Sequence, residues 1–116
     1  MLYQIVEVPS KPENLRATDI KPESVKLAWK APTDDRGSPV TAYGVFKRPA
    51  GAKEDEWEEI GETPLTTFTV PHLEMGTPYD FKVTARNKIG ESKPTLLNNI
   101  ETAKTISKCF ETLHAE

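Results

Sequence analysis

The sequence has little of what catalysis, metal binding and membrane insertion require. Its 116 residues include one cysteine, Cys109, and two histidines, His72 and His114. A single thiol excludes an internal disulfide, and Cys109 with His114 falls short of the four ligands of a structural zinc site. The six glycines stand singly, which excludes a glycine-rich phosphate-binding loop. These absences predict a protein that is not an enzyme and has no catalytic, metal-binding or cofactor-binding residues.

An excess of positive charge is also missing. The chain carries 15 Lys and Arg against 18 Asp and Glu, a net charge of -3, so neither nucleic acid nor an anionic membrane surface is an expected partner. No run approaches the roughly 20 apolar residues of a membrane-spanning helix, and the opening MLYQIVEV lacks the features of a signal peptide. The single cysteine and the lack of an Asn-x-Ser/Thr acceptor favour a cytoplasmic location.

What the sequence does contain is alternation of apolar and polar residues with period two. In SVKLAW, the side chains of Val25, Leu27 and Trp29 share one face, with Lys26 and Ala28 on the other. A chain of this length has room for one domain with its own core. The pattern therefore predicts half-buried strands of a single all-β domain.

Further segments alternate in the same way. In YDFKVTA, the side chains of Tyr79, Phe81 and Val83 share the core face, and the other face carries Asp80, Lys82 and Thr84. Before Pro22, the expected core residues are Leu15, Ala17 and Ile20. Turn-forming residues separate seven predicted strands: 13–20, 24–30, 40–47, 56–62, 67–71, 78–87 and 95–104. This spacing predicts a seven-stranded antiparallel sandwich of two sheets.

The stretch PTDDRGSPV, residues 32–40, admits three interpretations: an adhesion loop, a metal-binding loop or a turn between strands. An adhesion tripeptide needs a carboxylate after Arg-Gly, whereas Ser38 follows here. A calcium loop needs more alternating oxygen ligands than Asp34 and Asp35 supply. A turn between two strands is the interpretation that these residues favour.

Several short motifs, in order, resemble a fibronectin type III domain from Pro9 to near Lys104. The residues that carry the resemblance are Trp29, Pro32, Gly37, Ser38, Pro39, Leu73, Thr77, Tyr79, Ala85, Asn87, Gly90, Ser92 and Pro94. The loop 32–39 and the passage ARNKIGESKP look like the version found in the titin and twitchin family of giant muscle proteins. Three residues depart from that version: Arg36 stands where it usually has Gly, and Gly44 and Phe46 replace a bulky residue and a glutamate.

The resemblance implies an immunoglobulin-like sandwich whose core contains Trp29, Tyr43, Tyr79 and Phe81. Without a disulfide, the large indole of Trp29 is expected to bridge the two sheets. Tyr79 has the place of a tyrosine corner, which implies a hydrogen bond from its hydroxyl to the backbone near residues 72–75.

Strand parity predicts one candidate surface for a partner protein. With Tyr43 facing the core, Phe46 faces outward, and Trp57 joins it there if Ile60 is the inward residue of its strand. Lys82 and Arg86 follow on a neighbouring strand. We expect Phe46, Trp57, Lys82 and Arg86 to form an apolar patch with a charged rim. The alternative is an aromatic pair that only stiffens the sheet.

Six acidic residues cluster in KEDEWEEIGE, residues 53–62, close to the basic residues of the neighbouring strand and loop. Such asymmetry can steer a charged partner. Alternatively, charge on an edge strand discourages pairing with other chains.

The domain organisation predicted from these features has three parts: a linker or end of a preceding domain at 1–8, a fibronectin type III domain at 9–104, and a tail or linker at 105–116. The resemblance implies a non-catalytic structural and protein-binding module of a large, cytoplasmic, sarcomere-type protein. Neighbouring immunoglobulin-like or fibronectin type III domains, and myofilament proteins, are the expected partners. The alternatives are an extracellular adhesion or receptor module, or a regulatory domain flanking a kinase.

Overall fold

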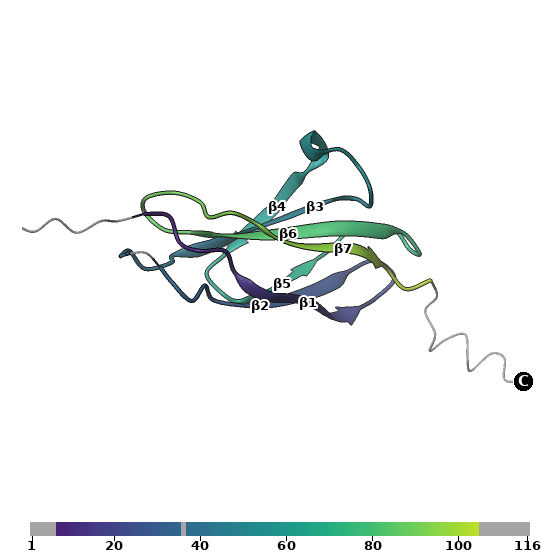
Figure 1. The fold of residues 1–116 in the computed structure, drawn as a ribbon. Coiled ribbons are helices and arrows are strands. Elements are labelled where there is room, and N and C mark those ends of the chain that lie inside the picture. Colours follow the sequence, from purple (N-terminus) through teal and green to yellow (C-terminus); the bar gives the residue numbers. More distant parts are fainter. Residues whose placement is uncertain (1–6, 36, 105–116) are drawn as a thin grey trace, which may run out of the picture.

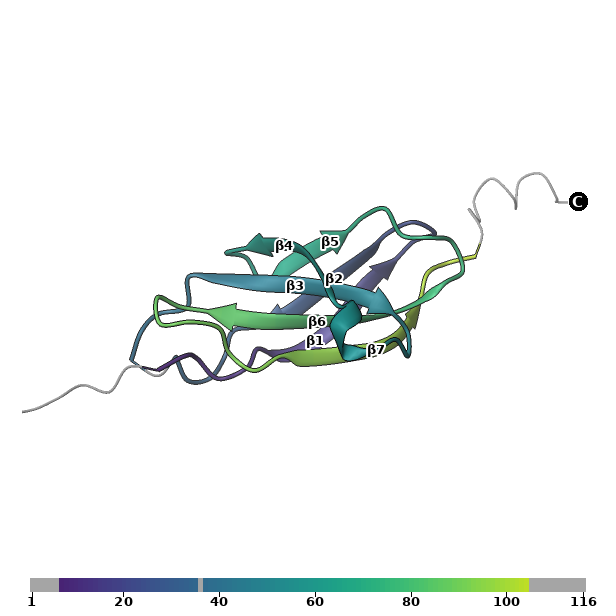
Figure 2. The same ribbon diagram turned by 90° about the horizontal axis from the view of Figure 1, so that it is seen from above.

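The computed structural model describes residues 7–35 and 37–104, which fold into two stacked β-sheets (Figure 1). The strands are β1 (Glu13–Ile20), β2 (Val25–Lys30), β3 (Ala42–Pro49), β4 (Glu58–Thr63), β5 (Thr67–Val70), β6 (Pro78–Arg86) and β7 (Thr95–Glu101). One sheet has the order β1-β2-β5 and the other β4-β3-β6-β7, with antiparallel neighbours throughout. Figure 2 shows the first and last described segments at opposite ends of the molecule. The predicted seven-stranded sandwich is confirmed.

The core lies between the sheets because each strand turns alternate side chains inward. Val25 and Leu27 of β2 form one fully buried cluster with Val45 of β3 and with Phe81 and Val83 of β6. Burial of aliphatic and aromatic side chains contributes about 1.5–3 kcal/mol each. The alternation read from the sequence therefore identifies the main stabilising contacts.

Aromatic side chains connect the two sheets. Trp29 of β2 meets Tyr43 of β3 edge to face, with ring centroids 5.5 Å apart and an interplanar angle of 65°. Both rings are almost fully buried, and burial raises the pKa of Tyr43 above its ordinary value. On β6, the rings of Tyr79 and Phe81 are 6.2 Å apart. Because Trp29 and Tyr43 belong to different sheets, their contact joins the layers where no disulfide does.

Tyr79 begins the buried part of β6 and also fixes the loop before it. Its hydroxyl oxygen accepts a hydrogen bond of 2.9 Å from the backbone N–H of Glu74. The partner lies within residues 72–75, where the tyrosine-corner resemblance placed it, but the hydroxyl accepts the hydrogen bond instead of donating it. The bond ties the β5–β6 connection to the start of β6.

The strand predicted at 56–62 begins later than expected. Residues Glu54–Glu56 form a short 3-10 helix, η1, in which Glu56 N–H donates to the carbonyl of Lys53. A register shift in the β3–β4 pairing leaves Ile60 as the extra residue, and Ile60 packs against the core. Trp57 lies between η1 and β4, outside the strand that the sequence predicted for it.

Gly61 allows β4 of one sheet to pack closely against β5 of the other. A methyl group on Gly61 of β4 would lie 2.6 Å from Cζ of Phe68 on β5, closer than real side-chain contacts permit. The missing side chain therefore makes room for a ring from the opposite sheet.

Four predictions of exposure were wrong. Three residues expected to face solvent are buried: Ala28, Asp80 and Thr84. They lie on central strands, where other side chains cover the outer face. Arg48 of the neighbouring strand β3 covers Asp80. Glu91, from the segment after β6, contacts Thr84. Conversely, Ile20 ends an edge strand and is 43% exposed.

Residues 32–40 connect β2 to β3. Asp35 Oδ1 accepts a hydrogen bond from Gly37 N–H, and Ser38 N–H donates to the Asp35 carbonyl. Gly37 has φ of 90°, a conformation that glycine adopts without steric cost. Arg36 lies outside the described residues, and the hydrogen bonds on either side of it are those of a turn.

Candidate protein-interaction surface

The four-stranded sheet presents a row of alternating cationic and aromatic side chains on the face directed away from the core. The row consists of Arg48, Trp57, Lys82, Phe46 and Arg86, and is called the aromatic–cation row below. β3 supplies Phe46 and Arg48, β6 supplies Lys82 and Arg86, and Trp57 comes from the segment before β4. Residues on one strand share this face because they are spaced by two or four positions.

Lys82 is at the centre of the row. Its Nζ atom is 4.8 Å from the Phe46 ring centroid and 4.9 Å from the Trp57 ring centroid. Cζ of Arg48 lies 4.4 Å from the Trp57 centroid, and Cζ of Arg86 lies 6.0 Å from that of Phe46. At these distances each cation is attracted to the electron-rich face of a ring, by about 0.5–1 kcal/mol at an exposed site.

The structure brings together Phe46, Trp57, Lys82 and Arg86, the four residues predicted to share this surface, and it corrects their arrangement. Both aromatic side chains are half-buried, and their ring faces contact cations. The surface is therefore not an open apolar patch with a charged rim. It is a mixed surface in which the charges lie between the rings.

Arg86 ends the row in a network of acidic residues. Its guanidinium donates to Glu59, Glu62 and Glu91, with Nη–O distances of 2.8–3.3 Å. The hydrogen bond to Glu59, together with those to Glu62 and Glu91, raises the pKa of Arg86. Burial alone would raise the pKa of Glu91, but hydrogen bonds from Thr84 and Arg86 lower it. The acidic segment and the basic strand thus pair with each other here.

The other end of the row contains a buried carboxylate that the sequence pattern placed on the solvent side. Asp80 is 3% exposed, and its Oδ2 accepts from Nε of Arg48 at 3.0 Å and from Gly51 N–H at 3.3 Å. Its Oδ1 accepts from Asn99 N–H at 2.8 Å. Burial would raise the pKa of Asp80, but these hydrogen bonds and the charge of Arg48 outweigh burial and lower it.

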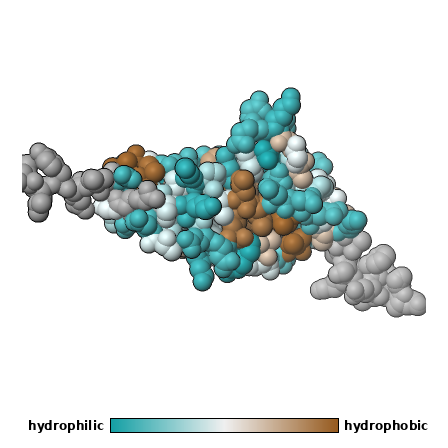
Figure 3. All heavy atoms as spheres, in the orientation of Figure 1, coloured by the Kyte–Doolittle hydropathy of each residue, from teal (hydrophilic) through white to brown (hydrophobic). Residues whose placement is uncertain are grey.

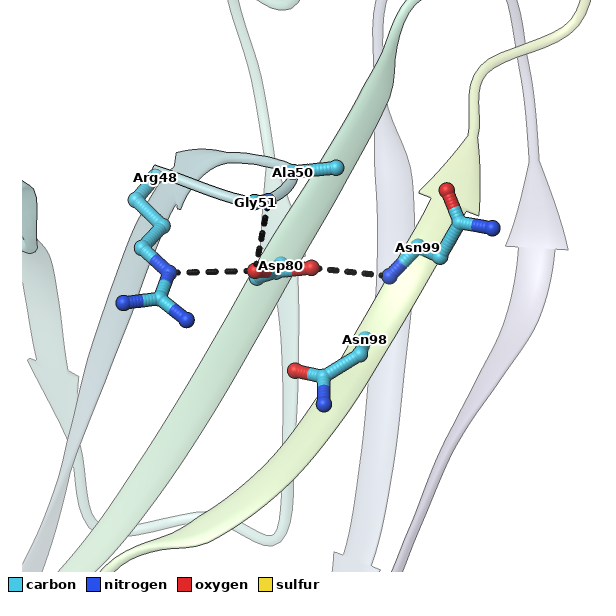
Figure 4. Close-up of a pocket in the computed structure, with 6 residues that line it drawn as sticks. All are labelled: Arg48, Ala50, Gly51, Asp80, Asn98 and Asn99. Atoms are coloured by element: carbon cyan, nitrogen blue, oxygen red, sulfur yellow. Dashed lines mark hydrogen bonds and ion pairs between the residues drawn. The ribbon is translucent and has the colours of Figure 1, made fainter. Parts of the chain in front are cut away.

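A hollow of about 490 Å³ lies beside this carboxylate (Figure 4). Its lining consists of Arg48, Ala50, Gly51, Asp80, Asn98 and Asn99. The lining residues come from the end of β3 and the segment after it, from β6 and from β7, so they are far apart in the sequence. The alternation of apolar and polar residues within single strands did not predict this hollow. The one sequence feature that pointed to it was Asp80, an acidic residue between the apolar residues Tyr79 and Phe81.

Apolar side chains also gather on another part of the surface. Figure 3 shows hydrophobic side chains over β7 and β1, where an edge of each sheet lies side by side. Leu96 is 50% exposed, and Leu15, Leu97 and Ile100 are partly buried against the core.

The described ranges lack a metal-binding cluster and a membrane-spanning helix. Residues 7–35 and 37–104 contain no group of three or more His, Cys, Asp or Glu side chains placed to hold a metal ion. No helix in the same ranges is long and apolar enough to cross a membrane.

The family follows from comparison with known proteins. A family model described as the fibronectin type III domain matches residues 10–97. The chain belongs to the fibronectin type III family. This fibronectin type III domain is 34% identical to Drosophila melanogaster titin over 110 residues, which are 93% of the chain and 1% of titin. It is 33% identical to human fast-type myosin-binding protein C over 116 residues, which are 98% of the chain and 10% of that protein.

Solved structures agree with this assignment. A crystal structure of titin domains matches the fibronectin type III domain with a TM-score of 0.78 and 35% identity, covering 84% of this chain and 33% of that one. A structure of titin kinase and its flanking domains matches with a TM-score of 0.76 and 33% identity, covering 93% and 19%. The predicted resemblance to titin-type domains is confirmed, although the chain spans a tenth or less of the two curated relatives.

Proposed function

We propose that this fibronectin type III domain is a non-catalytic structural and protein-binding module of a large multidomain protein of the sarcomere. The similarity to titin and to myosin-binding protein C supports this function and a cytoplasmic location. The domain would hold a fixed spacing within a chain of domains and bear load through its interstrand hydrogen bonds. Its outer sheet face would contact a filament protein.

Contacts at the N-terminal side support a place in a chain of domains. The Asn87 side-chain amide donates to the carbonyl of Glu7 at 2.8 Å, and Ser10 N–H donates to the carbonyl of Asp34 at 2.9 Å. The entering chain is therefore attached to the loops at this end. Such attachment would limit rotation of a neighbouring immunoglobulin-like or fibronectin type III domain. We propose residues 9–104 as the domain, with 1–8 and 105–116 as connections.

The aromatic–cation row is the observation that carries the protein-binding part of the proposal. Two half-buried aromatic residues, Phe46 and Trp57, and three cations meet on one sheet face. Aromatic and arginine side chains are those that most often dominate binding energy at protein interfaces. The name of the similar myosin-binding protein C makes the myosin filament the first partner to test.

Co-sedimentation tests this function. We expect the domain to sediment with purified myosin or actin filaments, and the double variant Phe46→Glu with Trp57→Thr to remain in solution. Thr69→Glu is the matched control, because it adds the same charge to an exposed position on the other sheet. Thermal unfolding of each variant separates lost binding from lost folding. Absence of sedimentation with both filaments, or equal loss in the control, would contradict the proposal.

The similarity to the titin kinase region supports a second candidate, a regulatory domain that flanks a kinase. The alternative to a cytoplasmic location is that the domain is an extracellular adhesion or receptor module. The sequence of the parent protein on both sides of this domain distinguishes them. A kinase next to the domain would favour the second candidate, whereas a signal peptide and a membrane span would overturn the sarcomeric proposal.

A further inference from the structure

The described chain leaves the sandwich along a fixed path. Ala103 N–H donates to the carbonyl of Lys21 at 3.2 Å, and the Ala103 carbonyl accepts from Gly76 N–H at 3.1 Å. One residue earlier, the hydroxyl oxygen of the buried Thr102 accepts a hydrogen bond of 2.9 Å from Thr77 N–H. The outgoing chain is therefore held between the β1–β2 turn and the β5–β6 connection, at the end of the sandwich opposite the entering chain (Figure 2).

Exposed apolar side chains flank this exit. Ile20 is 43% exposed and Met75 is 47% exposed, and each precedes a residue that bonds to Ala103. A hollow of about 290 Å³ lies at the same turn, and its lining consists of Lys21, Pro22, Glu23 and Ser24. Ile20, Pro22 and Met75 are called the exit surface below. Period-two alternation predicted Ile20 in the core, so the described residues leave an apolar side chain of β1 uncovered here.

The sequence that follows the exit contains an apolar stripe. Residues 105–116, TISKCFETLHAE, lie outside the described part of the chain. Their apolar residues have the spacing of one face of an α-helix: Ile106, Cys109, Phe110 and Leu113. The residues between them are polar: Ser107, Lys108, Glu111 and Thr112. An isolated helix shorter than about 12–15 residues is marginal in water, so such a stripe needs an apolar surface to pack against.

Lys104 places the start of this segment beside the exit surface. A methyl group on Gly76 would lie 3.2 Å from Cγ of Lys104, so the Lys104 side chain lies against the residue that follows Met75. Ile106 is two residues further on, and two residues of extended chain span about 7 Å. A segment attached through so short a connection has a high effective concentration at this surface, which favours it over a separate partner.

We infer that residues 105–116 pack on the exit surface as an amphipathic helix, with the apolar stripe covering Ile20, Pro22 and Met75. A helix of this length measures about 18 Å. The connection to the next domain would then be part of the folded unit and would set the direction in which that domain begins. This inference goes beyond the proposed function, which assigns residues 105–116 only as a connection.

The reactivity of Cys109 tests this inference in the unmodified chain, because Cys109 is its single thiol and belongs to the apolar stripe. Packing should slow the reaction with an aromatic disulfide reagent about tenfold relative to a free peptide of residues 105–116 at the same pH, since the thiol must first be released. A thiol that reacts as fast in the folded chain as in the peptide would overturn the inference.

Substitutions of the exit surface test where the segment packs. Met75→Glu, in the β5–β6 connection, and Ile20→Glu should each restore the fast reaction of Cys109, because a carboxylate opposes apolar contact. Ile89→Glu is the matched control, since Ile89 is 48% exposed and lies beyond the other end of β6. Rates are compared below the thermal unfolding transition of each variant. Equal acceleration by Ile89→Glu, or none by Met75→Glu, would contradict packing at the exit surface.

Methyl NMR signals distinguish the attached segment from other occupants. The Phe110 ring should displace the methyl signals of Ile20 and Met75, and Phe110→Ser should remove that displacement. Glu111→Ser, on the polar side of the proposed helix, should leave the same signals in place. The signals should not depend on protein concentration. Signals that move with concentration would identify a second copy as the occupant, and signals unchanged by Phe110→Ser would show that the segment packs elsewhere or not at all; either result overturns the inference.

Discussion

A methyl group on Gly44 would lie 2.5 Å from Nη2 and 2.7 Å from Cζ of Arg86. Gly44 is in the middle of β3 and does not have a positive φ, so a side chain at this position would conflict with the end of the Arg86 side chain and not with the backbone conformation. The guanidinium of Arg86 occupies that space and reaches three carboxylates from there. Gly44 and Phe46, two departures from the titin-type pattern, therefore both contribute to the position of Arg86.

Gly44→Ala should lower the free energy of unfolding by about 1–3 kcal/mol, because the added methyl group displaces the guanidinium. Denaturant unfolding measures the effect. In an Arg86→Ala background the same substitution should cost much less, since the obstructing group is gone. An equal cost in both backgrounds would show that Arg86 is not the cause.

Tyr79→Phe should cost about 1–3 kcal/mol, because the Glu74 N–H loses its acceptor in a partly buried place. The midpoint of denaturant unfolding checks this prediction. Tyr43→Phe, at a buried tyrosine on the neighbouring strand β3, is the comparison. A neutral Tyr79→Phe would mean that the hydrogen bond contributes nothing to stability.

Trp29→Ala should cost about 3–5 kcal/mol or prevent folding, since it removes the indole that contacts Tyr43 across the two sheets. Trp57→Ala removes the same side chain from a half-buried position and should cost clearly less. Parallel chemical denaturation of both variants gives the comparison. Similar losses would contradict the assignment of Trp29 to the core and Trp57 to the outer face.

Stability should fall in acid partly through Asp80. The pKa of Asp80 in the folded protein lies below its ordinary value of 3.8, so folding favours the charged carboxylate. This stabilisation is fully present above the ordinary pKa and is lost as the pH falls through the lower, folded value. Unfolding free energies measured from pH 5 downward should therefore decline less steeply for Asp80→Asn than for the parent protein. Glu91→Gln is the control for the other carboxyl with a lowered pKa.

Much of the outer face could be predicted in outline. Strand parity placed Phe46, Lys82 and Arg86 together, and the inward position of Ile60 left Trp57 on the same face. The insertion of Lys82 between the two rings could not be predicted, because it depends on side-chain conformations across three chain segments. The role of this face in binding stays a prediction.

The sequence by itself determined the strands, the two-layer architecture and the main core residues. Period-two alternation is a local property, and it sets which face of a strand each side chain occupies. Only the tertiary structure decided what covers each face. Asp80 is buried because Arg48, Gly51 and Asn99, from two other segments, converge on it. Such convergence depends on contacts between residues distant in the chain, which no local pattern specifies.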